Sequence, residues 1–302
     1  MSRRGARPSS RTRTLVLAHG LALLALAGSA GAGRAQILGK ILDAGEKAQE
    51  VAGKAQSVLP IETPEEVRIG RGIAATLAGY YTLARDSALT DYVTLVGLAV
   101  AEADPRSDIR YRFGVLDSDA VNALSAPGGY VFVTRGALAL MEDEAELAGV
   151  LAHEVAHVNR RHVVREIQKR ARTSLGAEAT QAALDADGAV FDQVVGLGTN
   201  VLFLGLSRDD ELEADSLGVA YAAAAGYDPA GLARFVTKLR ANEAKPFLAA
   251  LKATHPKPDV RLATIERSAK ATGRATGEGA EAAVTLPERF QSAAGGGTPP
   301  AS

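Results

Sequence analysis

Apolar residues near the start of the chain recur at helical spacing. Between Ile37 and Leu59 they return every three or four positions, with Lys and Glu residues between them. This periodicity is typical of an amphipathic helix and predicts a helical segment over residues 36–60. We interpret it as a helix packed on the main domain, and contact with a membrane surface or a partner protein is the alternative.

Two more helices are predicted before residue 105. In the first, Thr63 supplies an N-cap, Pro64 fits the first helical position, and Glu65 and Glu66 put carboxylates in the first turn. The second is expected over about residues 87–103. Both precede a change in the hydrophobic pattern after Pro105.

The pattern then changes to alternation of apolar and polar positions, which indicates strands. Residues 109–115 alternate in this way. Residues 121–124 and 130–134 flank a Pro-Gly-Gly turn at residues 127–129, so they are predicted to form a hairpin. The three strands together predict a small sheet.

Helical patterns return after the hairpin. Asp143, with Glu146 three residues later, is a capping pattern that opens a long helix running to about Gln168. Another helix is expected to end at Ala225, before Gly226, and the next to begin at residues 228–229.

Composition supports a fold of the α+β class that is mostly helical. The apolar fraction is 47%, and it comes mainly from Ala, Leu and Val, with no Trp. We expect a main domain over residues 61–270. The Gly-, Ala- and Pro-rich residues 271–302 are expected to be a disordered tail. The net charge of −1 gives no basic surface that would bind nucleic acid.

The N-terminus has the layout of a secretory signal peptide. Five Arg residues precede an apolar run over residues 15–27, and small residues follow up to Ala35. The run is short for a membrane span, so cleavage after residues 1–35 and export of the rest are predicted. A retained membrane anchor, which would keep the protein at a membrane surface, is the alternative.

Candidate chemistry begins with the sequence His153-Glu154-Val155-Ala156-His157. Because the chain has no Cys, a metal site must use His, Asp and Glu. Residues four apart share a helix face, so both imidazoles can reach one ion, and Glu154 lies close enough to act on the attacking water. Two ordinary buried histidines are the alternative. The apolar residues around the motif argue against it, because a buried unpaired carboxylate costs several kcal/mol.

A catalytic zinc site needs a third protein ligand. Glu211 and Asp215 lie four apart on one helix face. Glu211 is therefore expected to bind the ion, and Asp215 to accept a hydrogen bond from the outer nitrogen of a ligating His. Glu213 is the rival for the third ligand. We expect one Zn²⁺ per chain.

Several short segments together resemble one family of zinc endopeptidases. They are the segment from Asn122 to Gly129, the motif at residues 153–157, Ser207-Arg208 before Glu211, and Thr254-His255-Pro256 with Arg261. In order and spacing the chain resembles the family that includes HtpX and the CAAX prenyl proteases, on its BepA-like, soluble periplasmic branch.

The resemblance implies a zincin-like fold with an active-site helix, in which Glu211 is the third ligand. It also implies a strand that borders the cleft and pairs with an extended substrate through its backbone. A plain structural hairpin is the alternative. Leu124 and Ser125 stand where relatives often have Phe and Ala. The candidate substrate-binding residues are Asn122, Ala123, Leu124, Ser125, Ala126, Pro127, Gly128 and Gly129.

Two more residues acquire candidate catalytic roles from the resemblance. His255 is expected either to bind zinc as a fourth ligand that closes the site, or to donate a hydrogen bond to the oxyanion. Arg261 is expected to share the second task. The alternative puts both in a surface loop. His162 lies five residues past His157 and is expected to turn away from the metal as a structural hydrogen-bonding group.

The sequence therefore predicts a zinc metalloendopeptidase with Glu154 as general base, acting on exported or misassembled envelope polypeptides in the periplasm. Residues 37–59 are the candidate contact with a membrane or an assembly machinery. A chaperone or outer-membrane assembly factor with a latent protease site is the main rival. A purely structural helical protein is the third interpretation.

Overall fold

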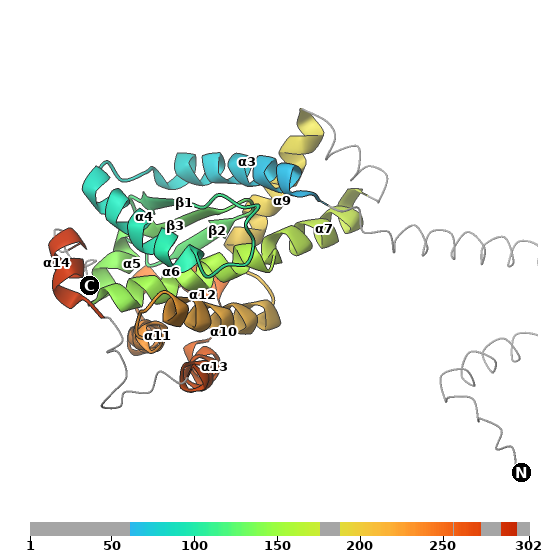
Figure 1. Cartoon of the computed structure of the whole chain (residues 1–302). Helices are drawn as coiled ribbons and strands as arrows, with labels where there is room; N and C mark the ends of the chain where they lie inside the picture. The colour runs from blue at the N-terminus through green and yellow to red at the C-terminus, as the bar shows by residue number, and fades with distance from the viewer. Residues whose placement is uncertain (1–60, 176–187, 256, 273–284, 295–302) are drawn as a thin grey trace, which may run out of the picture. The chain divides into compact units, whose positions relative to one another are not determined.

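The computed structural model describes residues 61–175, 188–255, 257–272 and 285–294, which all belong to a compact unit beginning at Val58. They form a mostly helical α+β fold with one three-stranded sheet, so the predicted fold class is confirmed (Figure 1). The predicted signal peptide and amphipathic segment lie outside the described residues. Among the described residues, none of the helices has the length and apolarity needed to cross a membrane.

The sheet is mixed, with the strand order β1-β3-β2. Strand β3 pairs in parallel with β1 and antiparallel with β2, so β2 is an edge strand. The β2–β3 turn contains Gly128 at φ 74° and Gly129 at φ 89°, a region that favours glycine. The backbone N–H of Gly128 donates to the buried Glu66 carboxylate. The strands are β1 (Arg112–Leu116), β2 (Ala123–Ala126) and β3 (Tyr130–Thr134).

Both faces of the sheet are covered by helices (Figure 1). Alternate positions of β3 enter two apolar clusters: Val131 and Val133 pack with α4 and α6, while Phe132 packs with α3 and α9. This places the hairpin between the two helical layers. The helices are α3 (Thr63–Tyr81), α4 (Ser87–Ala101), α5 (Arg135–Leu140), α6 (Glu144–Asn159) and α9 (Ala189–Leu204).

Two of the helix boundaries that differ from the predictions have a clear physical cause. Helix α3 begins at Thr63, but Glu62 is in the cap position, and the Thr63 hydroxyl donates to Asp108 instead. The helix expected to continue to Gln168 breaks after Asn159, and α7 (His162–Leu175) follows. The break occurs because Arg161 adopts φ 55°, a left-handed conformation that ends a helix.

Helices α10 and α11 pack on α6, and α13 packs on both of them (Figure 1). The tail expected to be disordered is partly helical: residues 287–294 form a helix in which Phe290 is buried and Arg289 pairs with Glu144, at the start of α6. Residues 273–284 and 295–302 of that tail lie outside the described residues. The elements are α10 (Arg208–Ala224), α11 (Gly231–Ala241), η1 (Pro246–Leu248), α12 (Ala249–Thr254), α13 (Pro258–Ala271) and α14 (Pro287–Ala294).

Candidate metal centre

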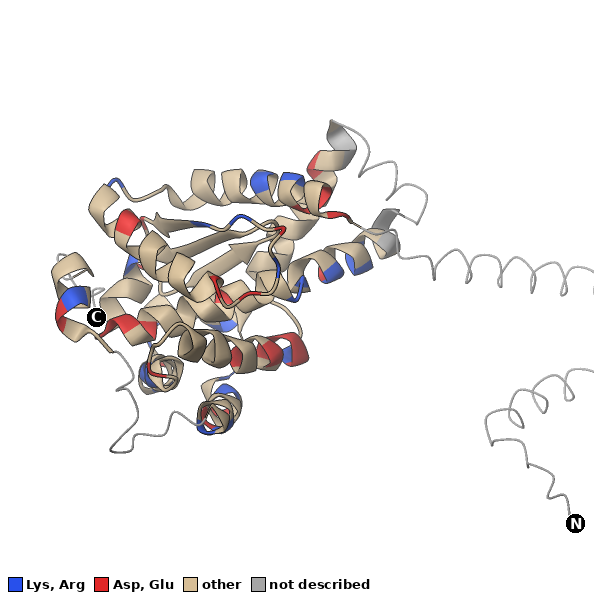
Figure 2. Cartoon of the chain, in the orientation of Figure 1, with Lys and Arg blue, Asp and Glu red and all other residues tan. Residues whose placement is uncertain are grey.

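Helices α6 and α10 pack closely enough to bring distant residues together. A Cβ added to Gly218 of α10 would lie 2.8 Å from the backbone nitrogen of His153, so only glycine fits at this contact. Ser207 caps α10 by accepting from the Asp210 N–H, and the acidic first turn suits the positive end of the helix dipole. Figure 2 shows acidic residues gathered at this end. Glu211 is thereby positioned next to α6.

Three candidate ligands converge between these helices. The Nε2 atoms of His153 and His157 lie 3.1 Å apart. Glu211 Oε2 is 3.7 Å from His153 Nε2, and Glu211 Oε1 is 3.6 Å from His157 Nε2. Ligand atoms about 2.0–2.1 Å from a tetrahedral zinc are themselves about 3.3 Å apart. The separations in this site bracket that value, so the residues fit a zinc ion.

The surroundings of these residues favour the protonation states that bind a metal. His153, His157 and Glu211 are almost completely buried. Burial lowers the pKa of His157 well below its ordinary value, which keeps its lone pair free. Burial alone would raise the pKa of Glu211, but His255, His157 and His153 outweigh it and lower that pKa. A neutral imidazole and an ionised carboxylate are the forms that coordinate metals.

Behind His153 lies a buried ion pair. His153 Nδ1 is 3.0 Å from Asp215 Oδ1, which accepts its hydrogen bond. Arg261 Nη2 lies 2.6 Å from the same oxygen, and Arg261 Nε lies 3.0 Å from Asp215 Oδ2. Burial would raise the pKa of Asp215, but the Arg261 charge outweighs it and lowers that pKa. Arg261 therefore holds Asp215, and its expected action on a substrate stays a prediction.

Behind His157 the partners are His162 and Glu213. His157 Nδ1 lies 2.8 Å from His162 Nδ1, and His162 Nε2 lies 3.0 Å from Glu213 Oε2. Glu213, the rival for the third ligand, therefore lies beyond His162 instead of beside the two Nε2 atoms. It is also half-buried and hydrogen-bonded by Arg160 Nε at 2.7 Å. The geometry favours Glu211 as the third ligand.

The candidate base contacts the edge strand. The Ser125 hydroxyl, on β2, donates a 2.7 Å hydrogen bond to Glu154 Oε2, and both residues are buried. Ser125 therefore faces α6, while its neighbours Leu124 and Ala126 enter the opposite cluster. Asn122 is buried just before the strand, and its side-chain oxygen accepts from the Ala123 N–H. All four β2 residues are buried, and three of them line a small cavity beside Glu154.

His255 reaches the metal site from the end of α12. Its Nδ1 lies 2.6 Å from Glu211 Oε2, and its ring centroid is 5.6 Å from that of His153. Burial would lower the pKa of His255, but Glu211 outweighs it and raises that pKa. Arg261 is 4% exposed and His255 is mostly buried, so the surface-loop alternative is wrong for both.

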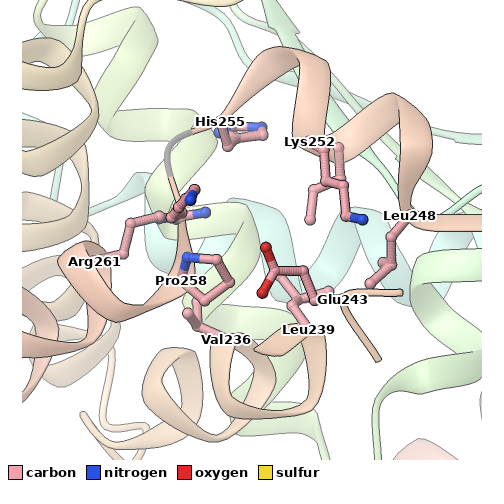
Figure 3. A pocket seen from close by; sticks show the side chains of 10 residues that line it. Val236, Leu239, Glu243, Leu248, Lys252, His255, Pro258 and Arg261 are labelled. Carbon is pink, nitrogen blue, oxygen red and sulfur yellow. The ribbon is translucent and has the colours of Figure 1, made fainter. Parts of the chain in front are cut away.

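Cavities adjoin the site on two sides of Glu154 and His255. The two that touch both residues hold only about 20 Å³ each, roughly the room for one water molecule. A larger cavity of about 170 Å³ adjoins them and has His255 and Arg261 in its wall (Figure 3). Its other walls are mainly apolar. They comprise Val236, Leu239, Glu243, Leu248, Leu251, Lys252, Lys257 and Pro258.

Two of these contacts were not foreseen from the sequence. The bond from Ser125 to Glu154 depends on the register of the sheet against α6, for which the sequence carries no signal. The bond between His157 and His162 depends on the helix break at Arg161. On a continuous helix, residues five apart point in different directions, which is why His162 was expected to turn away.

In a comparison with protein families, residues 87–269, more than half of the chain, match Peptidase family M48. The chain therefore belongs to this family of peptidases. This confirms the resemblance inferred from the sequence.

Named relatives agree. The chain is 26% identical over 245 residues to the Beta-barrel assembly-enhancing protease of Escherichia coli (strain K12), covering 78% of this chain and 49% of that protein. It is 33% identical over 178 residues to Mitochondrial metalloendopeptidase OMA1 of Schizosaccharomyces pombe (59% and 52%). It is also 33% identical over 177 residues to Protease HtpX homolog of Desulfatibacillum aliphaticivorans (47% and 55%). The chain spans about half the length of these relatives.

Proposed function

We propose that this chain is a metalloendopeptidase that hydrolyses peptide bonds with one zinc ion held by His153, His157 and Glu211, and with Glu154 as general base. The observation that carries the proposal is the convergence of two imidazole nitrogens and one carboxylate, 3.1–3.7 Å apart, at a buried point beside Glu154. This set of two His and one Glu suits a catalytic zinc and leaves a fourth position free.

Each residue around the ion has a distinct task in this mechanism. When bound, zinc supplies a Lewis acid that makes the attacking water acidic and polarises the substrate carbonyl. Glu154 accepts the proton of that water and later delivers it to the leaving amine. Ser125 holds Glu154 Oε2, so Oε1 is the oxygen left for the proton transfer. Asp215 keeps His153 in the tautomer that presents Nε2.

Substrate is proposed to bind as an extended peptide along β2. The strand is at the sheet edge and borders the cavities at Glu154, so backbone pairing there would hold a peptide regardless of its side chains. The space beside Glu154 is too small for a peptide, so binding requires movement around His255. The 170 Å³ cavity next to His255 then offers room for one substrate side chain.

The cellular setting is proposed from the N-terminal sequence and the relatives. The signal-peptide pattern of residues 1–35 supports export to the periplasm. The name of the Escherichia coli relative links that relative to β-barrel assembly. We propose unfolded or misassembled envelope polypeptides as substrates, with residues 37–59 as the contact to a membrane or assembly machinery. The rival is an assembly factor whose protease site is latent, which is favoured by the narrow cleft around His255.

The decisive test is Glu154→Gln, which keeps the size of the side chain but removes the base. Zinc content should stay at one per chain, while kcat on casein should fall by about 10²–10⁴-fold, the usual contribution of a general base. Glu102→Gln makes the same chemical change at an exposed residue that caps the C-terminal end of α4. As the matched control it should change neither the zinc content nor kcat. Substantial casein cleavage by Glu154→Gln would contradict the proposed mechanism.

His255→Ala separates the two roles of His255. If His255 closes the site at rest, the variant should cleave casein faster than wild type, because the fourth position becomes open to water. If it stabilises the oxyanion, kcat should fall instead. Lys252→Ala is the control, because Lys252 is exposed and lines the 170 Å³ cavity that His255 also lines. A faster variant would also strengthen the assembly-factor alternative, since the resting enzyme would then be latent.

A further inference from the structure

His162 and Glu213 form a second arm behind the candidate zinc site, and neither belongs to the ligand set. His162 is completely buried between His157 and Glu213, with hydrogen-bonding distances of 2.8 Å and 3.0 Å on its two ring nitrogens. Two histidines joined through their Nδ1 atoms need one donor and one acceptor. The arrangement is therefore possible only for certain positions of the ring protons.

These positions follow from the proposed ligand role of His157. Its Nε2 faces the metal site and needs a lone pair there, so its proton is on Nδ1. That N–H donates to His162 Nδ1, which must carry a lone pair. The proton of His162 is then on Nε2 and donates to Glu213 Oε2. Assigned in this way, every nitrogen and oxygen of the arm has a matching partner.

A second observation shows that the backbone is shaped for this contact. Arg161 is one of three described residues other than glycine with positive φ, and its 55° ends α6 and turns His162 back toward His157. Its guanidinium Nε is held 3.0 Å from the buried Glu66 carboxylate. Strained backbone of this kind tends to persist where function requires the geometry.

The same cluster has another interpretation, a second metal site. The side chains of His162, Asp210 and Glu213 lie close enough together to hold an ion. For that, His162 Nε2 would need a lone pair and its proton would move to Nδ1. That proton would then face the Nδ1 proton of His157 across 2.8 Å, two donors without an acceptor. The hydrogen-bond pattern therefore disfavours a second ion.

We propose that His162 is a positioning residue that holds the ligand His157 in its zinc-binding tautomer and orientation, with Glu213 as the terminal acceptor. This inference rests on the proposed zinc site, and it adds a second arm to the one formed by Asp215. Partners of this kind typically change metal affinity by about 10–100-fold when they are removed.

Zinc affinity of the whole mature protein, measured by competition with a chromogenic chelator, tests the proposal. His162→Leu should weaken zinc binding by about 10–100-fold. His162→Asn should recover most of the affinity, because its side-chain oxygen can accept from His157 Nδ1–H. Glu213→Leu, at a half-buried position, should fold readily and lose affinity about several-fold. Asp210→Asn is the matched control: Asp210 lies 3.6 Å from His162 Nε2, beyond hydrogen bonding, and zinc affinity should stay unchanged.

Two further measurements exclude a purely structural role. Cobalt substituted for zinc should give an altered visible spectrum in His162→Leu and a near-normal one in His162→Asn. In His162→Leu, the free energy of unfolding of the zinc-free protein, measured in urea, should change far less than the free energy of zinc binding. Unchanged zinc affinity in both His162→Leu and Glu213→Leu would overturn the proposal, as would two zinc ions per wild-type chain. Failure of wild type to bind zinc would instead overturn the proposed function.

Discussion

Two different sets of partners hold the candidate ligands: Asp215 with Arg261 is the first arm, behind His153, and His162 with Glu213 is the second arm, behind His157. Behind His153, Asp215 is completely buried and pairs with the buried Arg261. Behind His157, the acceptor is a buried His162, and its carboxylate partner Glu213 is 35% exposed. Removing one partner of a buried ion pair strongly destabilises the folded protein, because the other charge stays buried without a counter-charge. A half-exposed pair contributes little, because water screens its charges. The first arm should therefore govern folding as well as metal binding, and the second mainly metal binding.

The largest effect should come from breaking the buried pair with Asp215→Ala. Loss of the carboxylate leaves Arg261 buried without its counter-charge, so the free energy of unfolding should fall by about 3–5 kcal/mol. Urea unfolding of the zinc-free protein measures this. Asp215→Asn, which keeps the shape and one acceptor oxygen, should lose less. Equal stability of Asp215→Ala and wild type would remove the distinction between the arms.

The same pair predicts a pH dependence. The pKa of Asp215 is lowered on folding, because Arg261 outweighs the effect of burial. Its contribution to stability is therefore fully present above the unfolded pKa of about 3.9 and is lost as the pH falls through the lower folded value. The free energy of unfolding of wild type and of Asp215→Asn should be measured in urea from neutral to acidic pH. The difference between the two values should shrink toward low pH. A constant difference would contradict the assignment.

An intermediate effect is expected for Arg261→Lys. Lysine keeps the charge but cannot make the two-nitrogen contact with Asp215, so stability should fall by about 1–3 kcal/mol. Zinc affinity, measured on the folded protein, should fall by less than about 10-fold, because Asp215 can still accept from His153. A larger loss of affinity than of stability would mean that Arg261 acts on the ion more directly than proposed.

The smallest effect should come from Glu213→Gln on the second arm. The amide oxygen can still accept from His162, and the lost ion pair with Arg160 is near the surface, so stability should change by less than about 1 kcal/mol. The effect should also shrink as salt is added, because exposed charges are screened. A loss comparable to that of Asp215→Ala would show that the arms do not differ in the way described.

Most of the candidate site follows from helical spacing. Residues four apart share a helix face, so the sequence alone predicted that His153 would lie with His157 and Glu211 with Asp215. The structure then brings the two pairs together, and small residues such as Gly218 make the close approach possible. The helices were predicted from the helical spacing of their apolar residues. The hairpin was predicted from the alternation of apolar and polar positions around the Pro-Gly-Gly turn.

The remaining contacts depend on geometry that spacing does not encode. The left-handed conformation of Arg161 has no signal in its residue type, so neither the helix break nor the return of His162 was predicted. The pairing of Arg261 with Asp215, 46 positions earlier, was not predicted, because only the packing of α13 on α10 reveals it. Helix α14 follows a stretch rich in Gly, Ala and Glu, whose composition suggested disorder throughout.

Helix α14 also has a consequence for how the protein is made. Arg289 pairs with Glu144, Tyr92 and Tyr227 donate to the same carboxylate, and Thr285 accepts from the first backbone N–H groups of α6. These partners lie beyond residue 269, where the match to the family ends, or come from well-separated parts of the chain. During synthesis the ribosome must therefore release the chain at least as far as Arg289 before all of these contacts at the start of α6 can form.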